Sequence, residues 1–255
     1  MSRRVVGVLG AWLVAAAVVS ADSRIEYKAT EGGGSTLGSM VIGQGKIRIE
    51  ADQTTTVILD PTAATTTMID HSRKTFTRIG RAELAQFKAM MADIEKTMAS
   101  MPAEVRDMMK GRMGGMGGGE QPVTVATDQR ATVAGKSCRI YRTTFRGQVT
   151  AEYCMADPSV IEIAAADRAT MTAAMAWSKE LADSLASGPL GRFADSSPFR
   201  DGLVPLRQTS ISGTTRRTSE FVSAGPATLD AGTFNIPAGY KEQKLDPSGR
   251  GRGGT

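Results

Sequence analysis

The chain has 255 residues, a formal net charge of +5 and 22% charged residues. Its basic residues are spread along the sequence, so neither the charge nor its distribution gives the basic patch that nucleic-acid binding requires. With a single histidine and two cysteines, a histidine-based metal site is excluded, and the length suits one domain with a sizeable core.

The first 21 residues have the pattern of a secretory signal peptide. Two arginines precede an apolar run over residues 5–19, and small residues lead to Ala21. We therefore expect cleavage after Ala21 and export of a chain that begins at Asp22, whose net charge falls from +5 to +3 because both arginines are removed. No cysteine follows the apolar run, so no lipid attachment is expected. An uncleaved N-terminal anchor is the alternative.

Six short segments with β character follow, separated by glycine or polar turns. Ile25 and Tyr27, and later Ile47 and Ile49, alternate with charged residues in the two-residue period of a half-buried strand. Strands spaced this closely are expected to form antiparallel hairpins. The predicted strands cover residues 24–30, 37–42, 46–51, 55–60, 65–69 and 74–79.

The pattern then changes to that of a helix. Apolar residues step by three and four from Leu84 to Met108, which predicts a Met-rich helical lid over residues 81–110. Pro102 must kink or restart this helix. A glycine-rich linker is expected over 111–120. The residues assigned to the lid face, as candidate ligand contacts, are Leu84, Phe87, Met91, Ile94 and Met98.

Methionine is unusually concentrated here, with eight of the 14 methionines between Met90 and Met116. Three interpretations stay open. The side chains could be ordinary core, an adaptable apolar surface for acyl chains or hydrophobic segments, or soft ligands for Cu(I). The copper interpretation rests on two MxxM spacings, Met98/Met101 and Met113/Met116, and no histidine or cysteine accompanies them.

Strand patterns resume after the linker. A second helix is predicted over residues 168–186, ended by Gly188-Pro189. A disordered tail is expected over 246–255, which leaves 22–245 as one domain. The further strands predicted are 123–127, 131–134, 138–146, 149–155, 160–164, 203–211 and 217–224, with an extended piece over 233–240. The apolar side of the second helix carries Met171, Ala174, Met175, Leu181, Ala182 and Leu185.

The two cysteines, Cys138 and Cys154, are predicted to form a structural disulfide, because an isolated pair in an exported protein is typically oxidised. A hairpin centred on Arg146 would place them opposite each other. Closing this loop is expected to stabilise the fold by about 3 kcal/mol. The pair lacks the CxxC spacing of a redox site.

The sequence offers little for catalysis. His71 lies in a predicted hairpin turn beside Asp70 and Arg73 and is interpreted as a solvated turn residue. No nucleophile elbow, phosphate-binding loop or dinucleotide fingerprint is present. We predict no catalytic residue, no cofactor and no metal, and hence no enzyme.

Five short motifs carry a resemblance to a known family: Gly45–Glu50, Lys74–Phe76, Gly135–Tyr141, Gly202–Leu206 and Phe234–Tyr240. In this order they resemble exported bacterial proteins with a domain of unknown function that is similar to the lipoprotein-localisation carriers. The resemblance implies a mainly β, α+β fold in the periplasm. This fold is an antiparallel open half-barrel of about ten strands, with two helical segments over its concave face.

The resemblance and the lid pattern together favour a non-enzymatic periplasmic protein that binds a hydrophobic ligand in the half-barrel. The ligand would be a lipid, an acyl chain or a hydrophobic peptide. The alternative is an interaction or sensor protein that docks a partner through the Met-rich helix. Cu(I) binding is a third hypothesis.

Overall fold

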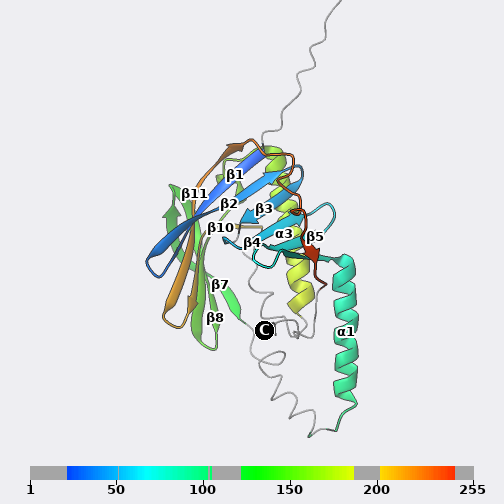
Figure 1. The fold of residues 1–255 in the computed structure, drawn as a ribbon. Helices are drawn as coiled ribbons and strands as arrows, with labels where there is room; N and C mark the ends of the chain where they lie inside the picture. Colours follow the sequence, from blue (N-terminus) through cyan, green and yellow to red (C-terminus); the bar gives the residue numbers. More distant parts are fainter. Residues whose placement is uncertain (1–21, 51, 103, 105–121, 187–201, 245–255) are drawn as a thin grey trace, which may run out of the picture.

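The described part of the protein is mainly β, with one open sheet and two long helices (Figure 1). The structure is a computed structural model and describes residues 22–50, 52–102, 104, 122–186 and 202–244. The N-terminal strands are β1 (Asp22–Glu31), β2 (Gly34–Gly43), β3 (Lys46–Glu50), β4 (Thr55–Asp60), β5 (Thr65–Asp70) and β6 (Thr75–Gly80). The later strands are β7 (Val123–Val133), β8 (Lys136–Phe145), β9 (Gln148–Ala156), β10 (Val204–Ser212), β11 (Thr215–Ala227) and β12 (Lys241–Glu242). The helices are α1 (Arg81–Ala99) and α3 (Ala165–Ala186), with a short 3-10 turn, η1, at Pro158–Val160.

The twelve strands of the described residues belong to a single sheet with the order β12-β6-β5-β4-β3-β2-β1-β11-β10-β9-β8-β7. The pairs are antiparallel except for β12 with β6. The expected α+β class and antiparallel open sheet are therefore confirmed, with twelve strands rather than about ten. The sheet curls until β7 approaches β11.

Tight two-residue turns explain why the hairpins form where the sequence predicts them. Gln44 and Gly45 both have positive φ, 52° and 71°, and Arg146 and Gly147 have 50° and 73°. Such turns match the twist of antiparallel strands, and glycine at the second position adopts this conformation without strain.

One predicted strand and the predicted extended piece are wrong. Residues 160–164 do not form a strand, because Asp157 accepts a hydrogen bond from the Ser159 backbone and Pro158 starts the η1 turn that leads into α3. Residues 233–240 are folded by turns, including bonds from Thr233 N to Asp230 O and from Asn235 N to Gly232 O, each 2.9 Å. The strand β12 begins only after them.

Helix α3 packs on one face of the sheet, which we call the inner face. It lies across β2 and β3, and its buried side chains join the main core. The predicted helix over 168–186 is thus confirmed, and it begins three residues earlier. The core residues of the sheet include Ile25, Met40, Ile42, Ile47 and Leu59, and those of α3 are Met171, Ala174, Met175 and Trp177.

Helix α1 begins directly after β6 and runs away from the sheet (Figure 1). Its start is fixed by the Glu83 carboxylate, which accepts a hydrogen bond of 2.9 Å from Gly80 N, as in one half of a capping box. Arg81 donates two hydrogen bonds to Glu180 of α3, of 2.9 and 3.0 Å. The helix ends at Ala99, ahead of Pro102, because a residue before proline disfavours helical geometry.

The opposite, outer face carries a smaller apolar cluster beneath the C-terminal strap, residues 228–244. Phe234 of the strap is buried against Val41, Ile58 and Ile69 of the sheet. The strap ends by pairing with β6, through Lys241 N to Lys74 O at 3.1 Å and Gln243 N to Phe76 O at 2.7 Å. It therefore covers the beginning of the β6 edge.

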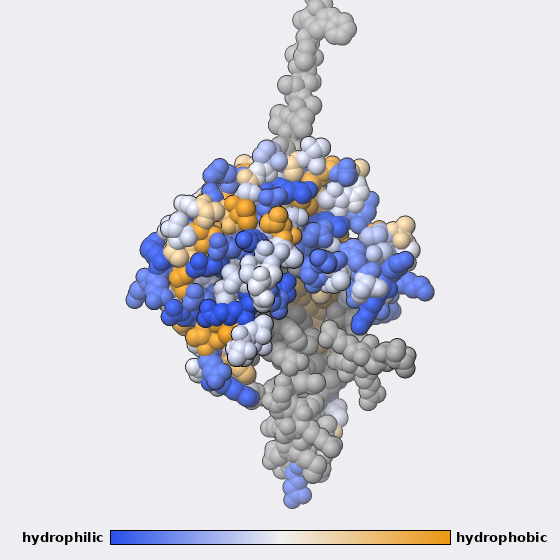
Figure 2. All heavy atoms as spheres, turned by 60° about the vertical axis from the view of Figure 1, so that its left-hand side comes forward, coloured by the Kyte–Doolittle hydropathy of each residue, from blue (hydrophilic) through white to orange (hydrophobic). Residues whose placement is uncertain are grey.

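The other edge strand, β7, is interrupted by a bulge. The pairing with β8 shifts between Ala126 and Arg130. Within the bulge, Thr127 Oγ1 donates to Ile140 O (2.9 Å), and Asp128 pairs with Arg139 at 3.7 Å. In Figure 2, where the side that carries β7 and β11 comes forward, apolar side chains form separate groups among polar ones.

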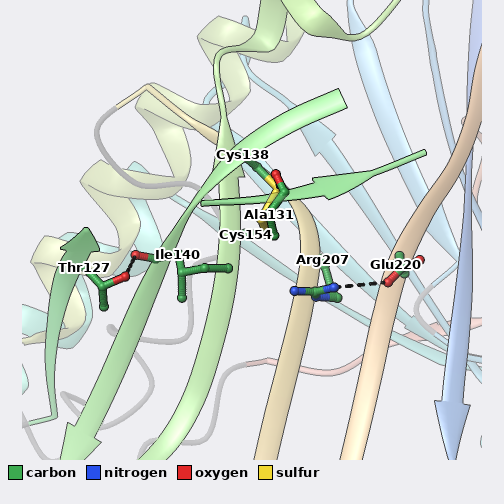
Figure 3. Close-up of a disulfide and its surroundings, with 7 residues drawn as sticks. All are labelled: Thr127, Ala131, Cys138, Ile140, Cys154, Arg207 and Glu220. Atoms are coloured by element: carbon green, nitrogen blue, oxygen red, sulfur yellow. Dashed lines mark hydrogen bonds and ion pairs between the residues drawn. A yellow bond between two sulfur atoms is a disulfide. The ribbon is translucent and has the colours of Figure 1, made fainter. Parts of the chain in front are cut away.

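The predicted disulfide is confirmed. Cys138 in β8 and Cys154 in β9 are bonded, with Cα atoms 5.2 Å apart, and both are buried (Figure 3). The predicted register is wrong, because Ile140 and not Cys138 lies opposite Cys154. The two-residue turn accounts for one step of the difference, and the register shift beside Thr143 and Thr144 accounts for the other.

Candidate functional site

The inner face extends beyond α3 along β7, β8 and β9. Side chains alternate along a strand, so Arg142 and Thr144 lie on the same face of β8 as the buried Ile140. Val125 pairs with Arg142, and Val123 and Val149 both pair with Thr144. These three valines, here the valine surface, are 56% (Val123), 52% (Val125) and 40% (Val149) exposed. An apolar surface thus continues where the buried core ends.

Polar side chains lie level with Val125, between the buried core and the outermost valines, Val123 and Val149. Arg142 Nε lies 3.0 Å from Glu152 Oε2 across the β8–β9 ladder. Another guanidinium nitrogen of Arg142 donates to Gln129 Oε1 at 2.8 Å. Further toward the sheet centre, Arg207 and Glu220 are paired at 3.8 Å beside the disulfide (Figure 3). Apolar valines and ion-paired side chains therefore lie side by side on this part of the inner face.

Beneath α3 the inner face is filled by soft side chains. Met171 and Met175 of α3 meet Met40 of β2 in one buried cluster. Trp177 is 3% exposed, and its indole N–H donates to Thr66 Oγ1 at 2.9 Å. Methionine adapts to changed packing more readily than branched side chains do. This interface is packed, yet it is built from adaptable groups around one anchored aromatic ring.

The five predicted lid residues are only partly placed. Leu84 and Phe87, in the first turns of α1, are 5% and 4% exposed, so they are buried and do not present a free ligand face. The side chains of Met91, Ile94 and Met98 lie outside the described residues, as does the whole linker 111–120. The helix that covers the inner face near its centre is α3, one of the two helical segments that the resemblance places over the concave face.

His71 is not the solvated turn residue that the sequence suggested. Its Nε2 lies 2.8 Å from Thr56 Oγ1, and its Nδ1 lies 2.9 Å from the Tyr240 hydroxyl of the strap. The two rings also meet edge to face, with centroids 5.7 Å apart. Since Tyr240 is 169 residues away in sequence, no local pattern could have revealed this contact.

The His71 contact belongs to a longer polar network on the outer face. Thr56 Oγ1 donates to Glu50 Oε2 at 2.8 Å, and Arg48 Nε donates to Glu50 Oε1 at 2.7 Å. Arg48 also donates to the Thr233 carbonyl of the strap at 3.0 Å. Because the Thr56 proton goes to Glu50, Nε2 of His71 must be the donor to Thr56. The network ties the strap to β3 and β4.

The same network sets the ionisation of Glu50. Burial raises the pKa of this carboxyl, but hydrogen bonds from Arg48 and Thr56 and the Arg48 charge outweigh it, so the pKa lies below its ordinary value. A pocket of about 130 Å³ opens beside these groups, and its charged lining residues are Arg24, Arg48, Glu50 and Asp230. Two basic and two acidic side chains face this space, so it has no strong preference for either charge.

Within the described ranges, no three His, Cys, Asp or Glu side chains gather closely enough to hold a metal ion. In the same ranges, no helix has the length and apolar character that crossing a membrane requires. Met113 and Met116, which the copper hypothesis needs, lie outside the described residues.

Comparison with known proteins assigns no family. No protein-family model matches the chain, and no curated protein matches it. An uncharacterized conserved protein from Thermus thermophilus matches with 7% identity and a TM-score of 0.40, covering 89% of this chain and 92% of the other. The structure of PNGF-II matches with 10% identity and a TM-score of 0.39, over 89% of this chain but 31% of its own.

A DUF1329 family protein from Desulfovibrio piger ATCC 29098 matches with 10% identity and a TM-score of 0.26, covering 85% of this chain and 90% of the other. Similarities this low establish neither relationship nor activity. The resemblance to the lipoprotein-localisation carriers is not confirmed by these comparisons.

Proposed function

We propose that the protein is an exported, non-enzymatic binding protein that holds an amphipathic acyl-chain ligand on the inner face of its sheet. The observation that carries this proposal is the valine surface, which continues the buried inner face into solvent. The disulfide is compatible with export to an oxidising compartment. We place the protein in the periplasm on the basis of the predicted signal peptide and the family resemblance.

The chemistry of the surface fits a ligand with one apolar and one polar part. An acyl chain lying along Val123 and Val125 would remove exposed apolar area from water, worth about 25 cal/mol per Å² buried. The neighbouring Arg142 would offer hydrogen-bond donors to a carboxylate or phosphate head, in competition with Glu152. A longer acyl chain would extend toward α3, where the packing of the methionine side chains can adjust.

The fluorescence of Trp177 would report a ligand that reaches the packed side chains beneath α3. A chain that begins at Asp22 has Trp177 as its only tryptophan, since the other is Trp12. A C16 fatty acid should bind with micromolar or tighter affinity and change the Trp177 emission during the titration. Native mass spectrometry of the same sample should show the added mass of the ligand.

The matched pair of variants is Val125→Glu and Leu37→Glu. Both side chains are exposed, but Leu37 lies on the outer face of β2, because it is four strand positions before Val41 of the outer-face cluster. Val125→Glu should weaken binding at least tenfold, because it places a charge in the apolar surface, whereas Leu37→Glu should leave binding unchanged. Equal affinity in both variants, or no binding to the unmodified protein, contradicts the proposal.

A second function is favoured by the exposure of α1. Beyond Phe87, the described side chains Lys88, Asp93 and Lys96 are exposed, and the helix leaves the sheet (Figure 1). A partner docked along α1 would be lost on Met91→Glu while fatty-acid binding stays intact. Loss of fatty-acid binding in Met91→Glu would instead support the original lid hypothesis.

A further inference from the structure

Asp167, in the first turn of α3, is a buried carboxylate that lacks a full set of partners. It is 4% exposed, and its Oδ2 atom has no hydrogen-bond partner among the described residues. Ser23 of β1 lies close by, because its Oγ accepts a hydrogen bond of 3.4 Å from Ala164 N, just before α3, and its side chain and backbone lower the pKa of Asp167. Burying a carboxylate without a compensating cation is costly.

The charges around Asp167 in the described part of the chain do not supply that cation. The nearby Asp22 carboxylate opposes ionisation of Asp167, and burial, the largest cause, also raises the Asp167 pKa. Arg168 is adjacent in sequence, but its guanidinium donates to the carbonyls of Ile161 and Ile163, both at 3.4 Å, and its charge acts on Asp157. A positive group is therefore missing on the β1 side of the carboxylate.

Signal-peptide cleavage after Ala21 would create such a group at this place. The new α-amino group would be the nitrogen of Asp22, one residue before Ser23, which bonds to the chain at the start of α3. One residue of extended chain spans only about 3.3–3.6 Å, so the ammonium would be created on the side of the carboxylate that faces β1. An ammonium there can pair with the carboxylate.

We propose that Asp167 is the receptor for the α-ammonium group of Asp22, and that cleavage after Ala21 completes an ion pair that fixes β1 to the start of α3. The proposal rests on the export part of the proposed function and not on ligand binding. Before cleavage the same nitrogen is an uncharged amide, so the pair exists only in the processed chain.

The test compares two chains that differ by one residue. One begins at Asp22 and the other at Ala21, which moves the ammonium by one residue, about 3.3–3.6 Å along the extended chain. NMR titration should give an α-amino pKa about one unit above the ordinary 7.7–8.0 in the Asp22 chain and an ordinary value in the Ala21 chain. Asp167→Asn in the Asp22 chain should return the value to ordinary.

The free energy of unfolding should depend on the ionisation of the same α-amino group. A raised pKa means that the extra stability is fully present below the ordinary value and is lost as the pH rises through the raised one. The Asp22 chain should therefore unfold at a higher urea concentration than the Ala21 chain at pH 7, and the difference should vanish by about pH 10. If Asp167→Asn fails to fold, this comparison still decides.

Equal α-amino pKa values in the two chains would overturn the pairing, as would a raised value that persists in Asp167→Asn. Mass spectrometry of the exported protein gives the cleavage position, and a chain that starts elsewhere than Asp22 would overturn the maturation step. None of these results depends on whether a fatty acid binds, so the two proposals fail separately.

Discussion

At the scale of single residues, a few side-chain hydrogen bonds of the outer-face network attach the C-terminal strap to the sheet. His71 and Arg48 each bond to one strap residue, Tyr240 and Thr233 respectively, while both also connect to Thr56. Thr56 is fully buried, so its hydroxyl must be satisfied inside the protein. The network therefore has a structural role that its polar composition alone does not suggest.

Removing the Tyr240 hydroxyl tests this role. Tyr240→Phe should destabilise the fold by about 0.5–1.5 kcal/mol, because His71 Nδ1 loses its partner while the ring contact stays. Urea unfolding measures the change. Tyr141→Phe is the control, since the Tyr141 ring packs against Tyr153 and Met155 and no hydrogen bond of its hydroxyl is seen in the described residues. Equal effects in both variants would argue against the network.

The lowered pKa of Glu50 predicts that the stability of the fold depends on pH. Its folded-state pKa lies below the ordinary 4.5, so its stabilising contribution is present above that value and is lost as the pH falls through the lowered one. Wild-type stability should therefore fall more steeply below pH 4.5 than that of Glu50→Gln. Because the Glu50 side chain is partly exposed, its contribution to the free energy of unfolding should be about 1 kcal/mol or less. Urea unfolding from about pH 6 to about pH 3 measures both slopes, and parallel curves would contradict the prediction.

At the scale of elements, the two helices have different roles. Helix α3 is part of the core along its length to Leu181, whereas Leu84 of α1 joins that core directly and Phe87 is also buried. The Arg81 guanidinium pairs with Glu180 and also lies 5.9 Å from the Trp177 ring centroid. The base of α1 is therefore fastened to α3, and the helix beyond it depends on this junction.

Phe87→Ala should accordingly cost about 3 kcal/mol, by removing a large buried side chain. Lys88→Ala, at the next and exposed position, should change stability by less than about 0.5 kcal/mol. Urea unfolding measures the stabilities, and circular dichroism reports whether helix content falls with Phe87→Ala. A small cost at Phe87 would mean that the junction contributes little.

The elements also show what could be predicted from the sequence. Alternating residues and glycine turns located most of the first six strands, because hairpin geometry is local. The contacts of α1 and α3 with the sheet were not accessible in this way, since both helices have an apolar side and only tertiary packing decides how much of the sheet each one covers. The contacts of Trp177 with Thr66 and of His71 with Tyr240 likewise join residues 111 and 169 positions apart.

At the scale of the whole molecule, the disulfide is a covalent link within a sheet of otherwise non-covalent pairs. Replacing Cys138 and Cys154 together with alanine should lower the free energy of unfolding by about 3 kcal/mol, because the open chain gains conformational freedom when unfolded. Urea unfolding with and without reductant measures this. Reductant should destabilise the wild type and leave the double variant unchanged, and an unaffected wild type would contradict the prediction.

The two edges of the sheet affect whether copies of this protein can associate by pairing their strands. An open sheet exposes backbone donors and acceptors at its edges, which can recruit strands from other copies and start fibres. Here the charged bulge at residues 127–129 breaks β7 into short runs, and β12 occupies part of β6. Neither end presents a long, regular template, so concentrated protein should stay free of intermolecular β-sheet despite carrying twelve strands.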